Sequence, residues 1–450
     1  MTISKLDKLN KLKVNVISLG CSKNLVDSEL ILGRLGEKGC ILVSSPKFAD
    51  IIIINTCSFI KDARKESYDV IAREAKEKSA YQKLIVCGCL PQLEKRKLFY
   101  RFPEIDALLG SSDFYRIDEA VEKILQGERV FLVSTPKFIY NSGFSRLVST
   151  PPGYAYLKIA EGCSNCCSYC LIPYLRGDFR SREVEDVVKE AKSLAKMGVK
   201  ELILIAQDIT YYGQDRGKSG ELLRLLEKLE KIKGISWIRL LYLHPGHFDV
   251  GLIRFMRDSD KVCRYVDIPL QHTHDEILKM MNRPPFKVAQ TLIEKIREAV
   301  PDVTLRTTFM VGFPGEKAYH FEKLMKDVEN LEFDWLGVFT YSREKNTPAY
   351  FLPEQVHKKI KEKRKNELLL LQRAITLKKN KEKVGKIFPV IIDLTNSDSE
   401  WGEGHTPFQT PEIDGKTLFI AKRFTPGQIF RGKVTSVKDF YDLYIQIESE

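Results

Sequence analysis

The sequence of 450 residues has no apolar run long enough to cross a membrane as a helix. Residues 1–13 are polar and lysine-bearing, and they lack the apolar stretch of a secretory signal peptide. Internal repeats and low-complexity tracts are also missing. We therefore expect a cytoplasmic protein with no membrane contact. Its length exceeds that of one ordinary hydrophobic core, which predicts two or three domains.

The sequence does contain ten cysteines and a net charge of +12. In the reducing cytosol these cysteines are not expected to form disulfides, so metal ligation or redox chemistry is the better interpretation. The positive charge favours a setting rich in nucleic acid or ribosomes, but it does not identify a ligand.

Strand-like and helix-like segments alternate through most of the chain, which predicts an α/β fold. In residues 1–140 this alternation indicates an N-terminal parallel α/β domain. In residues 150–353 six candidate strands predict a partial (βα)6 barrel with its site at the carboxyl ends of the strands. These six segments are 154–160, 201–208, 237–245, 265–272, 304–314 and 335–342.

The last hundred residues divide by charge. Residues 354–384 hold 11 Lys and Arg against 4 Glu, and they predict a basic helical connector with a solvated face. Residues 385–450 hold 7 Lys and Arg against 10 Asp and Glu, among them Glu403, Glu412 and Asp414. Their short strands with glycine and proline turns predict a small all-β barrel with a net charge of −3.

Four cysteines lie within eight residues directly after the first strand of the predicted barrel. Cys163, Cys167 and Cys170 have the spacing Cys-x3-Cys-x2-Cys. Three thiolates hold three irons of a four-iron cluster and leave the fourth iron open. A zinc site built from two Cys-x2-Cys pairs is the competing interpretation, but zinc folds normally separate such pairs by a loop. Cys166 has no place in the three-cysteine pattern.

A second set of cysteines stands in the N-terminal domain, where three apolar strands stop. Cys21, Cys57 and Cys89 each follow such a strand, and the carboxyl ends of parallel strands share one edge of a sheet. We therefore expect the three thiols to converge. Cys87 competes with Cys89, because residues two apart in a strand face the same way. Cys40 and Cys263 are most simply core residues.

The three-cysteine pattern, with Tyr169 before its last cysteine, resembles the radical S-adenosylmethionine superfamily. Together with the second set it is similar to the methylthiotransferase family, and in particular to its RimO branch. The motifs that carry this resemblance are Leu19–Glu29, Asn55–Ile60, Asp267–His272, Arg306–Glu316, Gly337–Ser342 and Pro411–Gly415. Ser22 stands where this branch usually has proline.

The resemblance implies two 4Fe-4S clusters and S-adenosylmethionine as cofactors, with Cys163, Cys167 and Cys170 holding the radical cluster and Cys21, Cys57 and Cys89 the auxiliary one. It implies an enzyme that methylthiolates the β-carbon of an aspartate in protein twelve of the small ribosomal subunit. Methyl transfer to cluster-bound sulfur would precede hydrogen abstraction by a 5′-deoxyadenosyl radical. An electron donor such as flavodoxin or ferredoxin is implied as a partner.

Two alternatives remain open at this point. The first is methylthiolation of a tRNA adenosine, as in the sister MiaB branch. That branch typically has Gln-Met-Asn after its first cysteine, where this chain has Ser-Lys-Asn, residues 22–24. The second is a non-catalytic iron–sulfur protein that binds RNA. The terminal β region resembles the TRAM domain, often an RNA binder, but an acidic module neutralises phosphates poorly and suits a basic ribosomal protein better.

Several polar or glycine residues at the ends of predicted strands are candidates for contact with S-adenosylmethionine. Gln207 and Asp208 could bond the methionyl group, and Arg306 could pair with its carboxylate. For each of them, a polar strand-end residue that faces solvent is the alternative interpretation. The resemblance favours Gly312 and Gly315 as adenosyl contacts and Tyr169 as part of the cofactor site, although a tight turn alone would also need glycine. The loop histidines His244, His247, His272 and His274 lack further ligands at metal spacing, and we predict no metal there.

Overall fold

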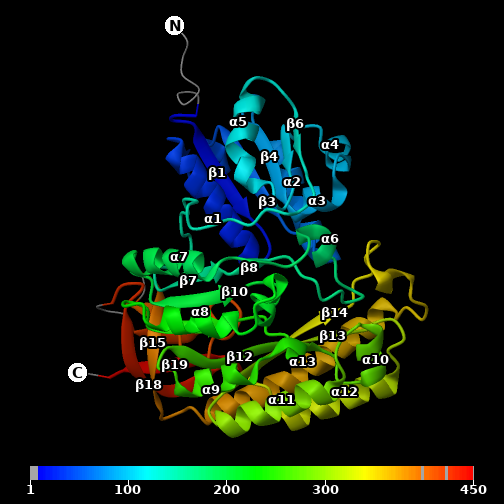
Figure 1. The fold of residues 1–450 in the computed structure, drawn as a ribbon, viewed down its shortest axis with the longest axis vertical. Helices are drawn as coiled ribbons and strands as arrows, with labels where there is room; N and C mark the ends of the chain where they lie inside the picture. The colour runs from blue at the N-terminus through cyan, green and yellow to red at the C-terminus, as the bar shows by residue number, and fades with distance from the viewer. Residues whose placement is uncertain (1–8, 397–399, 421–423, 449–450) are drawn as a thin grey trace.

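The computed structural model describes residues 9–396, 400–420 and 424–448. An N-terminal sheet lies at the top of Figure 1, a second sheet lies below it, and a small β-barrel packs beside the second sheet. The predicted α/β class with a terminal β-barrel is confirmed. Among the described residues, the structure holds no helix whose length and apolar character suit a membrane span.

The N-terminal sheet is parallel and has the strand order β2-β1-β3-β4-β5-β6. Runs of Val and Ile fill its central strands, whose residues are buried on both faces, as parallel sheets require. The strands are β1 Lys13–Ser18, β2 Ile41–Leu42, β3 Ile51–Thr56, β4 Lys83–Gly88, β5 Ala107–Leu109 and β6 Val130–Leu132. The helices are α1 Ser22–Glu37, α2 Lys61–Glu77, α3 Cys89–Glu94, α4 Lys97–Arg101 and α5 Ile117–Leu125.

The second sheet is also parallel, with the order β14-β13-β12-β11-β10-β7. All six predicted strands form. They are β7 Tyr154–Lys158, β10 Glu201–Ile205, β11 Trp237–Leu240, β12 Val262–Gln271, β13 Thr304–Val311 and β14 Trp335–Thr340. A short antiparallel ribbon, β8 Ala160–Glu161 with β9 Arg180–Ser181, follows β7.

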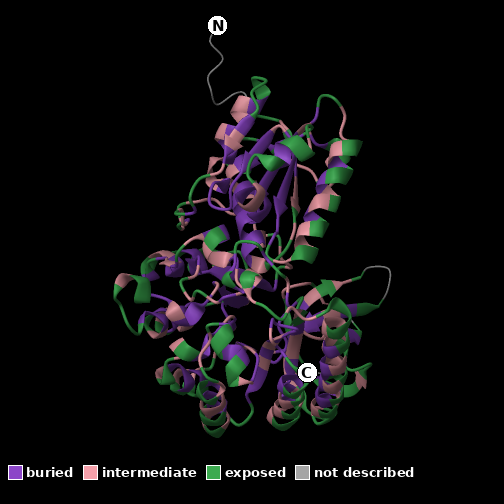
Figure 2. Cartoon of the chain, turned by 90° about the vertical axis from the view of Figure 1, so that its right-hand side faces the viewer, coloured by how far each residue is buried: buried purple, intermediate pink, exposed green. Residues whose placement is uncertain are grey.

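Amphipathic helices cover the outer face of the second sheet, with apolar sides buried and polar sides exposed (Figure 2). They are α7 Val184–Lys196, α8 Glu221–Glu230, α9 Val250–Asp258, α10 Asp275–Met280, α11 Phe286–Ala299, α12 Ala318–Leu331 and α13 Lys358–Lys381, while the short α6 Ile172–Arg176 precedes them. Single 3-10 turns are η2 Pro46–Phe48, η3 Phe114–Arg116, η4 Ile209–Tyr211, η5 Gln214–Arg216, η6 Pro245–His247 and η7 Pro348–Phe351.

The basic helix α13 is more than the predicted solvated connector. Leu368 and Ile375 belong to the core under the second sheet, and Gln372 donates to the backbone oxygen of Phe333 at 2.6 Å. Arg364 pairs with the buried Glu316 at 2.8 Å. The helix therefore completes the helical layer beside β14, and only its remaining faces are solvated.

The C-terminal strands form a closed barrel in the order β15-β16-β17-β19-β18. The strands are β15 Ile387–Thr395, β16 Trp401–His405, β17 Thr417–Ile420, β18 Ile429–Lys438 and β19 Asp442–Ile447. Alternate residues such as Val390, Ile392, Phe419 and Val434 fill its core.

This small barrel packs against the amino ends of strands of the second sheet. Trp335, the first residue of β14, donates its indole N–H to the backbone oxygen of Phe408 at 2.8 Å. Glu201, the first residue of β10, bonds Arg239 at 2.6 Å and His405 at 2.5 Å. The barrel therefore packs against the amino end of the second sheet, and we expect the chemistry at the carboxyl end.

The His405 contact makes stability depend on pH. Burial alone would lower the pKa of His405, but Glu201 and Asp393 raise it to about 9. Because the folded pKa lies above the ordinary value near 6.5, protonated His405 stabilises the fold fully below that value. We expect the free energy of unfolding to fall by on the order of 2–3 kcal/mol as the pH rises from about 6.5 through about 9. Urea unfolding at several pH values measures this slope, and His405→Gln should flatten it.

Candidate functional site

Three cysteines of the N-terminal sheet occupy the carboxyl ends of adjacent strands. Cys21 precedes α1 after β1, Cys57 follows β3 directly, and Cys89 begins α3 after β4. Strand β3 lies between β1 and β4, so the Cys57 position lies between the other two. The structure thus brings Cys21, Cys57 and Cys89 to one edge of the sheet, where the sequence predicted them.

The thiols of this first group interact with one another. Burial, together with smaller effects of the neighbouring Cys89 and Cys21, raises the pKa of Cys57 to about 12. Gly20 makes room for the group: a Cβ atom on Gly20 would lie 3.0 Å from the Cys57 sulfur and 2.5 Å from its Cβ. Gly20 also has a φ of 95°, which only glycine adopts readily. We call Cys21, Cys57 and Cys89 the auxiliary triad.

Cys87 packs in different surroundings from its neighbour Cys89. Its side chain is fully buried in the hydrophobic cluster beneath α1, among residues such as Val14 and Ile51. Cys89 instead packs with Leu171 and Leu175, at and just before α6. The two cysteines of this strand end therefore face different surroundings, and the geometry favours Cys89 as the third member. Cys40 and Cys263 are buried among apolar residues, in accord with the prediction.

Cys163, Cys167 and Cys170 lie on the loop between the ribbon strand β8 and α6, at the carboxyl end of β7. Burial raises the pKa of Cys163 to about 11, with further contributions from Asp208 and Cys167. Burial also raises the pKa of Cys170, and Cys167 and Cys163 add to the increase. The three thiols therefore act electrostatically on one another within one short loop, and we call them the loop triad.

Local backbone structure directs the three thiols of the loop triad inward and Cys166 outward. The amide of Cys170 donates to the backbone oxygen of Cys167 at 3.0 Å, which closes a turn. Cys166 has a φ of 52° and an exposed side chain, so it leaves the group. The amide of Ile172 donates to the Cys170 sulfur at 3.4 Å, a contact that suits an anionic sulfur ligand.

Both triads fit an iron–sulfur cluster by their donor chemistry. Each supplies three thiols, and thiolate is the ligand of such clusters. Burial disfavours thiolate in the metal-free protein, and a bound cation reverses that preference. Among the described residues, neither triad belongs to the groups whose ligand atoms all lie within 4.8 Å of one another, as a single zinc ion would require. We therefore assign Cys163, Cys167 and Cys170 to one four-iron cluster and Cys21, Cys57 and Cys89 to a second, as a proposal.

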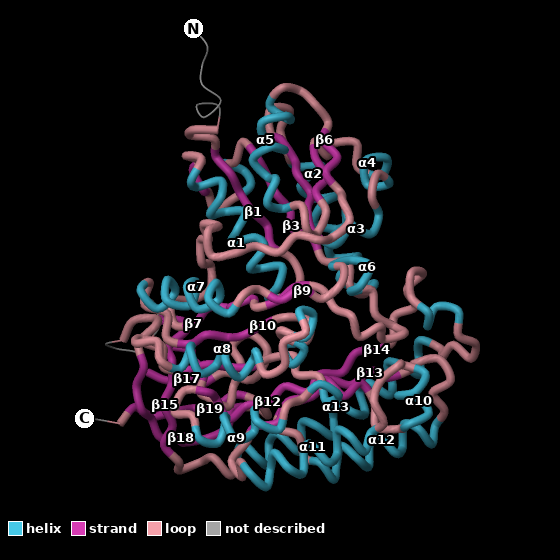
Figure 3. The backbone as a smooth tube through the Cα atoms, viewed as in Figure 1, coloured by secondary structure: helices cyan, strands magenta, loops and turns pink. Residues whose placement is uncertain are grey.

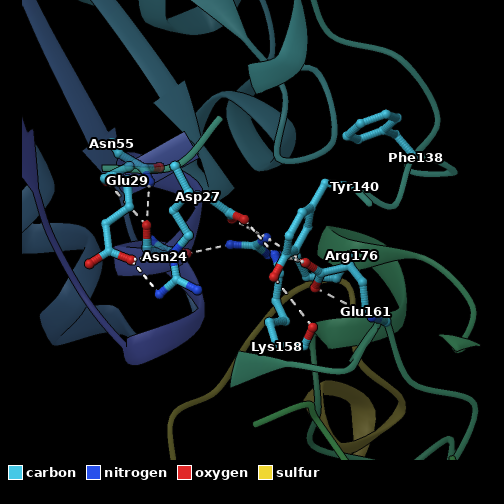
Figure 4. A network of polar contacts seen from close by, with 12 residues as sticks. Asn24, Asp27, Glu29, Asn55, Phe138, Tyr140, Lys158, Glu161 and Arg176 are labelled. Atoms are coloured by element: carbon cyan, nitrogen blue, oxygen red, sulfur yellow. Dashed lines mark hydrogen bonds and ion pairs between the residues drawn. The ribbon is translucent and has the colours of Figure 1, made fainter. Parts of the chain in front are cut away.

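A buried network of charges joins α1 of the N-terminal sheet to β8 and α6 of the second sheet (Figure 4). Arg176, the last residue of α6, pairs with Asp27 of α1 at 2.6 Å and with Glu161 of β8 at 3.3 Å, and it also donates to Asn24. Lys158 bridges the same two carboxylates at 2.5 and 2.7 Å. Arg176 lies beside Cys89 as well, and its charge lowers the pKa of that thiol against the effect of burial.

This network should be essential for holding the N-terminal sheet on the second sheet. Arg176→Met leaves Asp27 and Glu161 with fewer counter-charges in a buried site. Loss of one partner of a buried ion pair typically destabilises a protein by about 3–5 kcal/mol. We expect a decrease of that order in the free energy of unfolding, measured with urea. Asp69→Asn, which breaks the exposed pair with Lys65, is the control and should leave the free energy of unfolding essentially unchanged.

Gln207 and Asp208 lie at the end of β10, next to the loop triad. The amide nitrogen of Gln207 donates to Glu161 at 2.7 Å, while its oxygen is buried without a partner. That oxygen is available to a ligand N–H group. Asp208 accepts from Asn165 at 2.8 Å and contacts His247 at 2.8 Å, and it also caps η4. Its carboxylate therefore orients the cysteine loop, and its predicted contact with the cofactor remains a proposal.

Arg306 does not stand free to receive a carboxylate from the cofactor. Its guanidinium pairs with Asp267 at 2.8 Å and with Asp414 of the C-terminal barrel at 3.5 Å. Tyr265 donates to the same Asp414 at 2.7 Å. The prediction for Arg306 is not supported, because two protein carboxylates already neutralise this cation.

In the predicted adenosyl loop, the first glycine, Gly312, allows close packing against α13. Gly312 has a φ of 72°, and a Cβ atom there would meet the side chain of Lys361 on α13 at 2.3 Å. Gly315 has a φ of 82° and faces Met280 with more space, 3.2 Å. Tyr169 packs with Phe313 of this loop and hydrogen-bonds Cys167. The structure thus joins the loop to the loop triad through Tyr169, and cofactor contact by the glycines stays a proposal.

Two groups of histidines and carboxylates have ligand atoms close enough for a metal ion: Asp208, His244 and His247, and then His274, Glu276 and His320. Their hydrogen bonds argue against one. The Nδ1 atoms of His244, His274 and His320 accept backbone N–H groups, so Nε2 must carry the proton of the neutral ring. His244 caps η6, His274 caps α10, and His320 lies in the first turn of α12, so each has a structural role in the chain.

The sequence analysis missed the charged residues near the triads. Arg176 closes the network of Figure 4, and Arg283 acts electrostatically on both Cys163 and Cys170. Lys23, two residues after Cys21, is buried. Arg176 and Lys23 could have been predicted as site residues, because each stands within a few residues of a candidate ligand cysteine. Nothing local marks Arg283, which comes from a distant segment.

Comparison with known proteins agrees with this geometry. Residues 13–110 match the uncharacterized protein family UPF0004, and residues 157–328 match the radical SAM superfamily. The chain is 44% identical over 444 residues to the ribosomal protein uS12 methylthiotransferase RimO of Geobacter sulfurreducens, covering 98% of this chain and 99% of that protein. It is 44% identical to the protein of the same name from a Thermoanaerobacter species, covering 96% and 98%.

Among solved structures, the fold is similar to the radical S-adenosylmethionine methyltransferase TsrM from Kitasatospora setae, determined with cobalamin and a [4Fe-4S] cluster. The TM-score is 0.55 at 15% identity, covering 75% of this chain and 77% of that one. At this identity the likeness concerns the fold alone. It agrees with an α/β domain stacked on a parallel radical-SAM sheet (Figure 3).

Proposed function

The chain belongs to the RimO family of ribosomal protein uS12 methylthiotransferases, and from this premise we propose that it methylthiolates an aspartate of uS12 at the β-carbon. It is a radical S-adenosylmethionine enzyme whose cofactors are S-adenosylmethionine and 4Fe-4S clusters. When bound, these groups supply the radical, the methyl group and the sulfur.

One observation carries the proposal: two separate groups of three thiols lie on either side of α6. Leu171, next to Cys170 of the loop triad, packs directly against Cys89 of the auxiliary triad. A radical enzyme that only abstracts hydrogen needs one such group, whereas insertion of sulfur needs a second site for the sulfur. The two groups thus approach each other through α6 and the residue before it, as a reaction that uses both groups requires.

The protein residues around the triads position ligands and exclude water. Glu161 holds the amide of Gln207 so that the unpartnered amide oxygen stays fixed in a buried site. Asp208 anchors the cysteine loop through Asn165. The charge network around Arg176 fixes the spacing between the two sheets. These contacts preorganise the site, which is where a scaffold contributes most to such a reaction.

A basic substrate such as a ribosomal protein suits the acidic C-terminal barrel by charge, but Asp414 does not provide that surface. Its side chain is 2% exposed and bonds Tyr265 and Arg306, and Glu403 pairs with Lys416. Tyr156 donates to Glu412 at 3.1 Å. The expectation that an acidic surface with Glu403, Glu412 and Asp414 docks the substrate is therefore corrected for Asp414. Asp414 and Glu412 bond residues of the second sheet, whereas Glu403 pairs within the barrel and stays partly exposed. An electron donor such as flavodoxin or ferredoxin completes the proposal.

The test is an anaerobic reaction of reconstituted enzyme with uS12 and, separately, with tRNA. We expect methylthio-aspartate in uS12, detected by mass spectrometry, together with release of 5′-deoxyadenosine. Modified adenosine in the tRNA with unmodified uS12 would refute the proposal in favour of the tRNA alternative. The names of the relatives do not favour that alternative.

A further inference from the structure

The first turn of α1 holds a buried cation with no anionic partner. Lys23 is 7% exposed. The other lysines and arginines buried among the described residues all pair with a carboxylate within 4 Å, and they are Lys158, Arg176, Arg182, Arg239 and Arg364. Within the described part of the chain, Lys23 alone of this set makes no ion pair.

Lys23 makes one strong contact, and it is with an aromatic ring of the second sheet. Its Nζ atom lies 3.0 Å from the centroid of the Tyr242 ring. The ring face attracts an ammonium group but satisfies none of its three N–H donors as an oxygen would. No side chain among the described residues forms an ion pair with this ammonium, so its acceptors come from outside the chain, as water or a bound anion.

Tyr242 places this cation at the carboxyl end of the second sheet. The residue follows β11 and has a φ of 64°, a conformation that is strained for a tyrosine. Its amide donates to Asp267 at 3.0 Å, which holds the strained turn in place. Lys23 therefore reaches from the N-terminal sheet to the end of the second sheet where we place the chemistry.

Helix stability does not explain a lysine at position 23. The first turn of α1 is the positive end of the helix dipole, where a cation is disfavoured and a carboxylate would be stabilising. Cys21 of the auxiliary triad is two residues away. A lysine that is buried, unpaired and at the unfavourable end of a helix, beside a candidate site, indicates a role in binding an anion.

We propose that Lys23 binds the side-chain carboxylate of the substrate aspartate and so presents the adjacent β-carbon to the site. This inference rests on the proposed function. A carboxylate offers the acceptor that the ammonium lacks, through a charge-assisted hydrogen bond. The methionyl carboxylate of S-adenosylmethionine has the same chemistry, and the experiment separates the two sources.

The experiment uses full-length reconstituted enzyme and two forms of uS12, one with the native aspartate and one with asparagine at that position. Wild-type enzyme should bind the aspartate form more tightly. In Lys23→Met this preference should disappear, and kcat/KM for methylthiolation should fall on the order of 100-fold, mainly through KM. Lys23→Arg should retain most of the preference, and Lys97→Met, at the exposed start of α4, should behave as wild type.

Further readouts separate the alternatives. We expect the iron content and the cleavage of S-adenosylmethionine without substrate to stay within about twofold of wild type in Lys23→Met, because neither needs the substrate carboxylate. If Lys23→Met also loses cleavage of S-adenosylmethionine without substrate, the assignment is wrong. Lys23 would then bind the carboxylate of the cofactor and not that of the substrate. An unchanged preference for aspartate in an active Lys23→Met enzyme would overturn it as well. Wild-type enzyme that leaves uS12 unmodified would instead refute the proposed function, and the aspartate assignment with it.

Discussion

Replacing Cys163, Cys167 and Cys170 together by alanine is expected to abolish reductive cleavage of S-adenosylmethionine. The loop triad is the only group of three thiols on the second sheet among the described residues, so no other thiols there replace it. Protein purified without oxygen should carry about eight irons as wild type and about four as this variant. The measurements are iron content and 5′-deoxyadenosine release.

Cys166→Ala is the matched control for that variant. Cys166 belongs to the same loop but is exposed and directed away from the triad, so its loss should leave about eight irons. Full iron in the triple variant, or zinc in place of iron in the wild type, would contradict the assignment of the loop triad.

Replacing Cys21, Cys57 and Cys89 together should separate the two halves of the reaction. We expect reductive cleavage of S-adenosylmethionine to persist, because the loop triad stays intact. Methylthiolation of uS12 should fall below detection, because the proposed site for the sulfur is lost. Product analysis by mass spectrometry, run beside deoxyadenosine release, measures both activities in one sample.

Cys87→Ala tests which cysteine of β4 belongs to the auxiliary triad. Cys87 packs in the apolar cluster beneath α1, so this variant should keep the full iron content and its methylthiolation activity. Methylthiolation that persists in the triple variant, or iron lost from Cys87→Ala, would show that the second site is elsewhere.

The sequence predicted the features that depend on local pattern. Runs of Val and Ile located β3, β4 and the strands of the second sheet, because apolar content and length distinguish buried strands. The convergence of Cys21, Cys57 and Cys89 followed from one rule, that parallel strands end at a common edge. Both predictions needed no knowledge of contacts between distant segments.

The features that the sequence could not predict depend on such contacts. Arg306 looked available for a ligand, but Asp414, more than a hundred residues away in sequence, pairs with it. The apolar residues of α13 lie among so many lysines that the sequence did not reveal its packing against β14. Lys23 could be recognised only by comparing the partners of every buried cation, which requires coordinates.

The most direct test of the central claim is mass spectrometry of uS12 and tRNA from a strain that lacks this protein, before and after its gene is restored. We expect uS12 to lose its methylthio group in the deletion strain and to regain it with the wild-type gene, but not with the Cys21, Cys57 and Cys89 variant. Methylthio-adenosine in tRNA should be unaffected throughout. Unchanged uS12 with a loss of methylthio-adenosine would contradict the account.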